Sequence, residues 1–247
     1  MKKVLLLLLM FPFISFAQSE ETLEIEDEKK PTKYWYKWDI GINGGVNINN
    51  PISENNTFSD INYMGNLYGL TLIYHFNRFI AFKADLDIEN KGWIIENFEL
   101  PDDVNSTGGS VLNLENVTQV LDYFDIPAFL HVGFGKKLKF DINIGPYFGF
   151  KIKDEIYSYE PDGTQLSSSQ TRGMIGMSEF ENFDYGLVYG VGLDYQFHER
   201  FSFGFDALYE KGMKIINNDG YKNNSIDFDF GINCRIGKKE KKLFKSK

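Results

Sequence analysis

Cysteine is almost absent from this chain, and Cys234 is the only one among 247 residues. A lone cysteine forms no internal disulfide, and Cys234 lacks the neighbouring ligands that a metal site requires. Histidine is scarce as well, at three residues. The pair His198-Glu199 does not begin a zinc-binding HExxH motif, because position 202 is serine. We therefore expect no metal and no cofactor.

Long apolar runs are missing too. The longest, Val4 to Phe16, is shorter than the roughly 20 residues that a membrane-spanning helix needs. It follows two lysines and ends at Ser15-Phe16-Ala17, which is the small-x-small pattern of a signal peptide. Basic charge is also not in excess, since the net charge is −9, and this argues against a nucleic acid partner.

Alternation of apolar and polar residues is what the chain does contain. Between Leu138 and Lys153, apolar residues such as Phe140 and Ile142 alternate with polar residues such as Asp141. Successive side chains of a strand point to opposite faces, so this segment is a strand with one apolar and one polar face. The same pattern predicts eight strands, at residues 36–49, 63–76, 79–91, 119–134, 138–153, 183–197, 201–212 and 225–237.

The predicted connections differ in length at the two ends of the strands. Tight turns at 77–78, 135–137 and 198–200 alternate with long polar segments at 50–62, 92–118, 158–182 and 214–224. An exported chain without a spanning helix can cross a membrane only as a closed barrel. We predict an all-β fold, an eight-stranded antiparallel transmembrane β-barrel with short periplasmic turns and long extracellular loops. The predicted segments are a signal peptide (1–17), a flexible periplasmic lead-in (18–33), the barrel (34–237) and a basic periplasmic tail (238–247).

The apolar face is predicted to contact outer-membrane lipid. An eight-stranded barrel has just enough room inside for side chains to fill it, and the many large apolar residues here would overfill it. Glycine and charged residues dominate the other face and suit a narrow lumen. Aromatic residues also gather at both predicted membrane interfaces. They are Tyr34, Trp35, Tyr36, Trp38, Phe76, Phe79, Phe134, Phe197 and Phe201 at the turn end, and Trp93, Phe98, Tyr157, Phe180 and Phe183 at the loop end.

A set of charged residues is predicted to face the lumen. It consists of Lys83, Asp85, Asp87, Glu89, Lys91, Asp141, Lys151, Asp206, Asp229 and Arg235. In so narrow a barrel these residues are expected to form a plug in which opposite charges neutralise one another, rather than the lining of a pore. His75 and His131 are expected on the same face, hydrogen-bonded to neighbouring carboxylates.

Several short motifs resemble a family of barrels from Bacteroidota. They are Glu89-Asn90-Lys91-Gly92, Tyr123-Phe124-Asp125-Ile126-Pro127, Gly145-Pro146-Tyr147, the glycine-rich run from Asp184 to Gly192, and Leu208-Tyr209-Glu210-Lys211-Gly212. The chain is similar to outer-membrane barrels described as "porin family" or PorT-like. That resemblance implies a small barrel, commonly without an assigned activity. Some PorT-like members are tied to protein secretion, but no residue of this chain carries that role.

These observations predict a location and leave three hypotheses for function. We expect an outer-membrane protein of a Gram-negative cell that is not an enzyme and has a structural, recognition or secretion-accessory role. A protein partner would then bind at its external loops or at its periplasmic side. The first alternative is a narrow porin-like channel for ions or small solutes. The second, a hydrolase, would need serine and histidine at the outer rim, and no histidine lies in a predicted outer loop.

Overall fold

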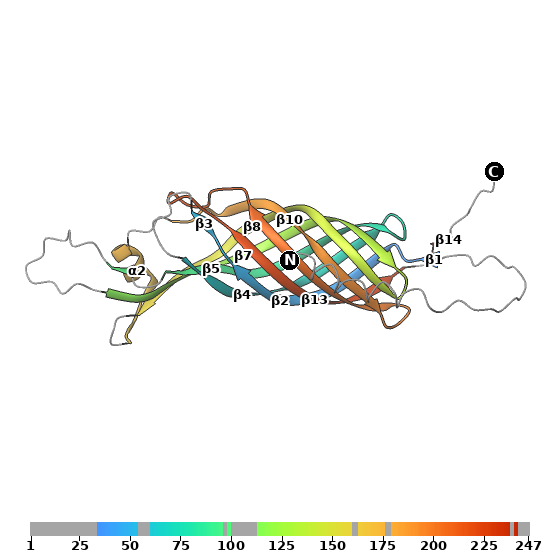
Figure 1. Cartoon of the computed structure of the whole chain (residues 1–247), viewed down its shortest axis with the longest axis horizontal. Helices are drawn as coiled ribbons and strands as arrows, with labels where there is room; N and C mark the ends of the chain where they lie inside the picture. Colours follow the sequence, from blue (N-terminus) through green and yellow to red (C-terminus); the bar gives the residue numbers. More distant parts are fainter. Residues whose placement is uncertain are drawn as a thin grey trace, which may run out of the picture. The chain divides into compact units, whose positions relative to one another are not determined.

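The computed structural model describes residues 34–53, 60–95, 98–99, 113–159, 163–175, 179–237 and 240–241. Eight long strands in them form a closed antiparallel ring (Figure 1). They are β2 (Trp38–Asn49), β4 (Asp60–His75), β5 (Ile80–Ile95), β7 (Asn113–Gly135), β8 (Leu138–Tyr159), β10 (Phe183–Gln196), β11 (Phe201–Gly212) and β13 (Asn224–Ile236). The predicted fold class is confirmed.

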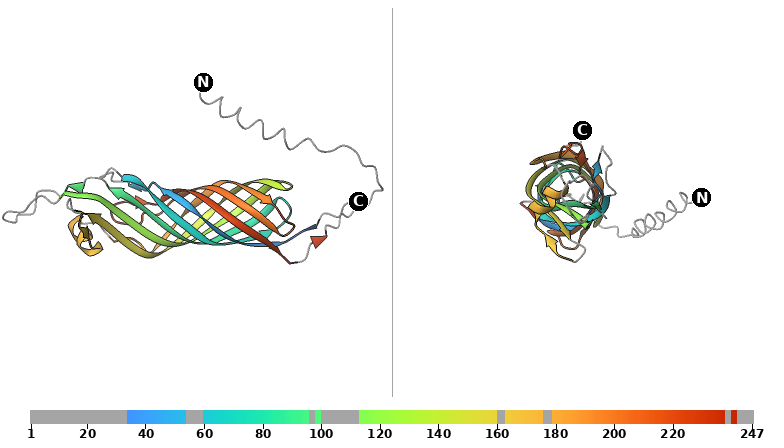
Figure 2. Two further views of the ribbon diagram at one scale, coloured as in Figure 1. Left: turned by 90° about the horizontal axis from the view of Figure 1, so that it is seen from below. Right: turned by 90° about the vertical axis from the view of Figure 1, so that its left-hand side faces the viewer.

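The order around the ring follows the order along the chain. Each of these strands pairs with the next one, and β13 pairs with β2 to close the circle. The view along the axis in Figure 2 shows the ring directly. The predicted signal peptide and lead-in lie outside the described residues.

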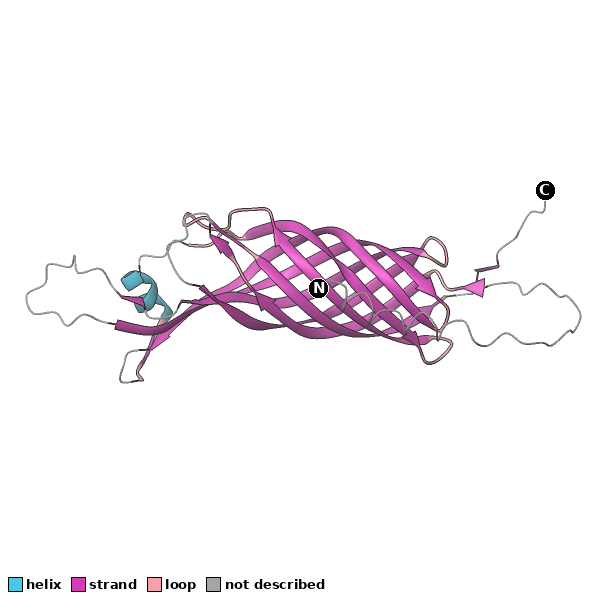
Figure 3. Ribbon diagram, in the orientation of Figure 1, coloured by secondary structure: helices cyan, strands magenta, loops and turns pink. Residues whose placement is uncertain are grey.

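Short strands lie outside the ring. They are β1 (Tyr34–Trp35), β3 (Ile52–Ser53), β6 (Phe98–Glu99), β9 (Gln165–Leu166), β12 (Tyr221–Lys222) and β14 (Glu240–Lys241). β14 belongs to the predicted tail and pairs with β1, whereas β3 pairs with β12. The helix α2 (Ser168–Ile175), cyan in Figure 3, packs beside β8. In the described part of the chain, no helix is both long and apolar enough to span a membrane.

The two faces of the strands separate as predicted. Ile142 and Phe230 are 54% and 62% exposed, whereas their neighbours Asn143 and Asp229 are buried. The outer wall is therefore apolar and the inner wall polar, which is the arrangement that a lipid surrounding requires.

Tight turns connect the strands at one end of the barrel, which we call the short-turn end. In the turn between β4 and β5, the Asn77 side-chain oxygen accepts hydrogen bonds from the backbone N–H groups of Phe79 and Ile80. In the turn between β7 and β8, Gly135 has φ = +133°. This region of φ is open to glycine and strained for other residues, so a glycine is required there. The opposite end is the loop end.

Four strands extend further toward the loop end than the alternation predicts, and the first is β4, which begins at Asp60 rather than 63. β5 continues to Ile95 rather than 91, β7 begins at Asn113 rather than 119, and β8 continues to Tyr159 rather than 153. One reason is a bulge, since Ile152 has no paired residue in β7 and the inward positions shift from odd to even numbers beyond it. A second reason is that the inner wall becomes apolar at this level.

The exposure pattern predicts how the outer wall responds to charge. Replacing Phe230, in the middle of β13, by arginine should lower the free energy of unfolding by about 2–4 kcal/mol, because the new charge faces the bilayer midplane. The matched control is Ile236→Arg, on the same face at the end of the strand, where a cost of about 0–1 kcal/mol is expected. Urea unfolding in lipid vesicles measures both. Equal losses would contradict the assignment of Phe230 to the lipid-facing midplane.

Candidate functional site

The barrel interior holds far more acid than base. Among the described residues, ten carboxylates are buried, against two lysines, Lys83 and Lys91. The ten are Asp39, Asp85, Asp87, Glu89, Asp125, Asp141, Asp184, Glu210, Asp227 and Asp229. Buried charges are stable only when they are paired or hydrogen-bonded, so the arrangement of these groups decides what the interior can do.

Lys91 forms the centre of one charge cluster. Its Nζ lies 2.6 Å from Glu210, 2.7 Å from Asp125 and 3.1 Å from Glu89. The same ammonium group lies 4.7 Å from the centre of the Tyr147 ring, which adds a cation–π contact. Strands β5, β7, β8 and β11 each contribute to this cluster, and it therefore ties together four strands of the ring.

Lys83 organises a second cluster closer to the short-turn end. Its Nζ lies 2.7 Å from Asp206 and 3.5 Å from Asp85. Asn143 donates hydrogen bonds from its side-chain nitrogen to Asp206 and Asp141, and its side-chain oxygen accepts one from Nδ1 of His131. At the end itself, the His75 ring lies 2.9 Å from Asp39, and Arg235 lies 3.9 Å from the same carboxylate.

The ten charged residues singled out in the sequence are distributed from the short-turn end to the loop end of the barrel, and most of them are buried. Lys83, Asp85, Asp87, Glu89, Lys91, Asp141 and Asp229 are buried, and Asp206, Lys151 and Arg235 are half-buried. Lys151 lies near the loop end, where its ammonium group donates to the backbone oxygen of Phe180. The expected pairing of opposite charges within this set is incomplete, since Asp87 and Asp229 form no ion pair with any described residue.

Sequence reasoning left out several members of the clusters. Asp125 and Glu210 contact Lys91, and Asp39 contacts His75, yet none of the three was in the predicted set. The alternation of the strands carries a usable signal for each, since each occupies an inward position between two outward ones. His75 contacts a carboxylate directly, whereas His131 lies 2.8 Å from the side-chain oxygen of Asn143 and 3.8 Å from the nearest carboxylate, Asp141.

The loop end of the barrel is sealed by a hydrophobic cluster. Trp93 stacks on Tyr221 with ring centres 4.6 Å apart, and Phe180 contacts Trp93 edge-on at 5.5 Å. The prediction that Trp93 and Phe180 belong to an outer aromatic girdle is therefore wrong. Both side chains are buried, because Trp93 occupies an inward position of β5 and Phe180, in the connection before β10, packs against it. The cluster consists of Trp93, Ile95, Val117, Leu121, Tyr123, Ile156, Leu166, Phe180, Ile216 and Tyr221.

Strands β7 and β8 continue past the seal as a two-stranded ribbon, β8 forms a short hairpin with β9, and α2 lies alongside (Figure 3). The Ser158 and Thr171 hydroxyls hydrogen-bond at 2.7 Å, and the Ser168 hydroxyl donates to the backbone oxygen of Ile156. We call residues 152–159, 165–166 and 168–171 the outer hairpin surface. These hydrogen bonds hold α2 against β8, so the surface consists of ordered secondary structure rather than of irregular loops.

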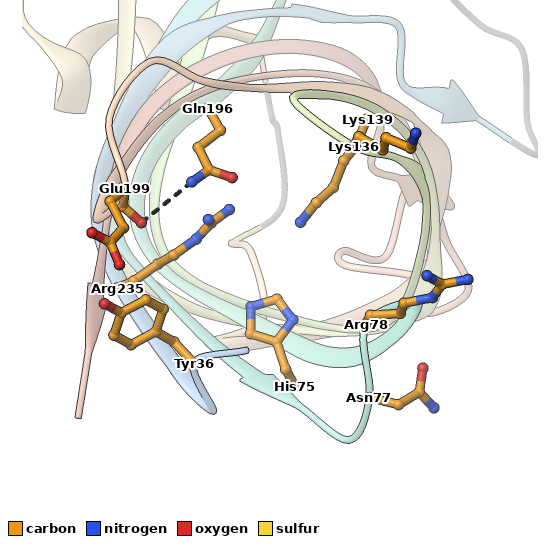
Figure 4. Close-up of a pocket in the computed structure, with 10 residues that line it drawn as sticks. Tyr36, His75, Asn77, Arg78, Lys136, Lys139, Gln196, Glu199 and Arg235 are labelled. Carbon is orange, nitrogen blue, oxygen red and sulfur yellow. Dashed lines mark hydrogen bonds between the residues drawn. The ribbon is translucent and has the colours of Figure 1, made fainter. Parts of the chain in front are cut away.

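The short-turn end opens into a basic vestibule of about 300 Å³ (Figure 4). Arg78, Lys136, Lys139 and Arg235 supply positive charge around it, with Glu199 as the acidic residue of the lining. Tyr36, predicted for the girdle at this end, is instead buried and lines the vestibule. The Gln196 amide donates to the backbone oxygen of Glu199 at 3.3 Å. The two ends thus differ, with an apolar seal at one and an open basic mouth at the other.

An apolar outer wall, a polar filled interior and a closed ring define a membrane β-barrel. Residues 16–216 match the family model described as "Outer membrane protein beta-barrel domain", and the chain belongs to that family. It is a small eight-stranded barrel of the outer membrane. No match was found among curated proteins.

Ail and OprG are among the solved structures that resemble it at low identity. Ail of Yersinia pestis is 17% identical, with 80% of this chain and 99% of that chain covered and a TM-score of 0.41. OprG of Pseudomonas aeruginosa is 14% identical, with 82% and 98% covered and a TM-score of 0.43. Similarity at this level carries no information on ligands or partners.

Proposed function

We propose that this protein is a non-enzymatic, non-conducting barrel that anchors the outer hairpin surface in the outer membrane for recognition by a protein partner. The filled interior is the observation that carries the proposal. Apart from the vestibule, two cavities lined by described residues of the lumen have volumes of about 20 and 30 Å³, which is room for single water molecules rather than a continuous path. The hydrophobic cluster around Trp93 then blocks the loop end.

The outer hairpin surface suits recognition because it is both exposed and held in place. Tyr159 and Lys153 are exposed on β8, and Ser169 and Gln170 are exposed on α2. A surface that is ordered before binding loses less conformational entropy when a partner docks. We also propose that residues 1–17 are cleaved on export and that the short-turn end faces the periplasm. A PorT-like role beside a secretion system is the narrower form of the same proposal.

Planar-bilayer recording tests the non-conducting part of this proposal. Reconstituted protein, with insertion verified by protease protection, should give no stepwise current across the physiological voltage range. Since charge cannot cross the apolar seal, the expected trace is that of the bare bilayer. Stepwise ion-selective conductance would reject the plug and support the alternative, a narrow channel.

Site-specific photo-cross-linking in intact cells tests the recognition part. A cross-linker placed at Tyr159, on the outer hairpin surface, should yield a discrete protein adduct. The same group at Tyr195, which is exposed on the lipid-facing wall, is the matched control and should yield none. Identical adduct patterns at the two positions, or no protein adduct at Tyr159, would contradict a recognition surface.

A further inference from the structure

The basic vestibule at the short-turn end has more positive charge than its own carboxylates can balance. Four cationic side chains line it, against one carboxylate, that of Glu199. The four are Arg78, Lys136, Lys139 and Arg235. This is the reverse of the barrel interior, where buried acids outnumber buried lysines. A concave space of about 300 Å³ lies at the lower end of the size range of ligand pockets.

Most of this positive charge is not used inside the barrel. Arg235 lies 3.9 Å from the lumen carboxylate of Asp39. The other three cations form no ion pair with any residue in the described part of the chain, and Arg78 instead stacks 4.1 Å from the centre of the Phe79 ring. The lysines of the lumen, in contrast, each contact two or three carboxylates. The vestibule therefore offers cationic groups to a ligand.

These cationic groups surround the vestibule rather than meeting at one point (Figure 4). Arg78 comes from the turn between β4 and β5, Lys136 from the turn between β7 and β8, and Arg235 from the end of β13. Figure 4 shows Arg78 and Arg235 on opposite sides of the ring, with the Arg235 guanidinium group pointing inward. A single compact anion cannot contact both sides at once. Carboxylates at positions i and i+2 of an extended chain are about 7 Å apart and can.

The position of the vestibule inside the ring favours a peptide over a lipid. Exposed aromatic side chains mark the membrane interface on the outer wall at this end, namely Phe76, Phe79, Phe134, Phe197 and Phe201. A lipid that contacts this wall has its headgroup outside the ring, whereas an extended chain can enter the vestibule along the barrel axis. Glu199 also offers an acceptor for backbone N–H groups, which a peptide has and a phosphate group lacks.

We propose that the basic vestibule binds the acidic end of an extended peptide, with its carboxylates against Arg78, Lys136, Lys139 and Arg235. Hydrogen bonds from guanidinium and ammonium groups to carboxylates are about twice as strong as neutral ones. The volume of about 300 Å³ admits a chain end but no folded domain. The partner is therefore a protein or peptide with an acidic segment on the side of the membrane that the short turns face. This site goes beyond the proposed function and is independent of the outer hairpin surface.

Fluorescence anisotropy with labelled hexaglutamate tests the site, using the full-length protein in micelles of a non-ionic detergent. The anisotropy should saturate at one peptide per chain, and the affinity should fall with added salt because the contacts are ionic. Lys139→Gln removes a half-buried cation and should weaken binding about tenfold. Lys136→Gln removes an exposed one and should weaken it about threefold. Labelled hexalysine should not bind.

The matched control is Lys211→Gln, which removes an exposed lysine near the loop end and should leave the affinity unchanged. Heat-modifiable migration on gels verifies that each variant is folded, and Lys136→Gln, in an exposed turn, keeps the test usable if Lys139→Gln does not fold. Glycerol phosphate, a soluble analogue of a lipid headgroup, should not displace the peptide at equal charge concentration.

Three outcomes would overturn the proposal. The first is the absence of saturable binding to the wild-type protein. The second is equal affinity in the wild type and in the folded Lys136 and Lys139 variants, which would place the peptide elsewhere, for example on the basic tail at 238–247. The third is displacement by glycerol phosphate, which would assign the vestibule to lipid headgroups.

Discussion

Replacing Lys91 by methionine is expected to lower the free energy of unfolding by about 3–5 kcal/mol. Methionine keeps much of the apolar stem, but the ammonium group that holds Glu89, Asp125 and Glu210 is lost. Three carboxylates are then buried against one another without a cation, and removal of one partner from a buried ion pair is far more costly than the pair itself is stabilising. Urea unfolding followed by tryptophan fluorescence in lipid vesicles measures the loss.

Two further variants separate charge from packing in this experiment. Glu210→Gln in the Lys91→Met background removes one buried negative charge and should restore part of the lost stability. Lys153→Met is the matched surface control, since Lys153 is exposed and pairs with Glu155 in contact with solvent, and it should change stability little. Unchanged stability in Lys91→Met would mean that the surrounding carboxyl groups do not depend on the ammonium group.

Replacing Trp93 by alanine should also cost about 3–5 kcal/mol, for a different physical reason. Trp93 is completely buried in the cluster that seals the loop end, between the rings of Tyr221 and Phe180. Alanine leaves a cavity that these neighbours cannot fill, because they come from connections held by their own hydrogen bonds. For example, Tyr221 and Ile216 are joined through their backbones at 2.8 Å.

Trp93→Phe is the matched control for the seal. The Trp93 indole N–H has no hydrogen-bond acceptor among the described residues, so phenylalanine removes a buried donor that gains nothing from the fold. The aromatic contact is largely kept, and we expect a loss below about 1.5 kcal/mol. Thermal unfolding monitored by circular dichroism compares the variants. Equal losses for alanine and phenylalanine would show that ring packing is not what holds the seal.

The strands and their faces could be predicted because they depend on a period of two residues. Phe140 and Ile142 point outward and Asp141 points inward for a purely geometric reason, so a single sequence is enough. The segments of β5, β7 and β8 nearest the loop end could not be predicted in this way. Ile152 interrupts the pairing with β7, and many of the inward residues beyond that level, such as Trp93 and Ile156, are apolar, so polarity no longer marks the two faces.

The interior could be predicted as a list of inward residues but not as a set of pairs. Lys91 and Glu210 are 119 positions apart, and their contact at 2.6 Å depends on the register of every strand between them. Register and stagger are properties of the closed ring, so no local pattern reveals which acid meets which lysine. For the same reason the excess of acid near Asp227 is visible only in three dimensions.

Closure of the ring between β2 and β13 has a consequence for how this chain folds. Seven of the eight strand contacts join strands that are neighbours along the chain, whereas β2 must wait for a strand about 180 residues later. Until then both edges of the sheet expose unpaired backbone groups, which makes the open sheet prone to aggregate. We therefore expect the seam to form last, after the whole chain has been delivered to the membrane. Asn43 lies on this seam and bonds to Asp229 across it, so formation of the internal network and completion of insertion are one event.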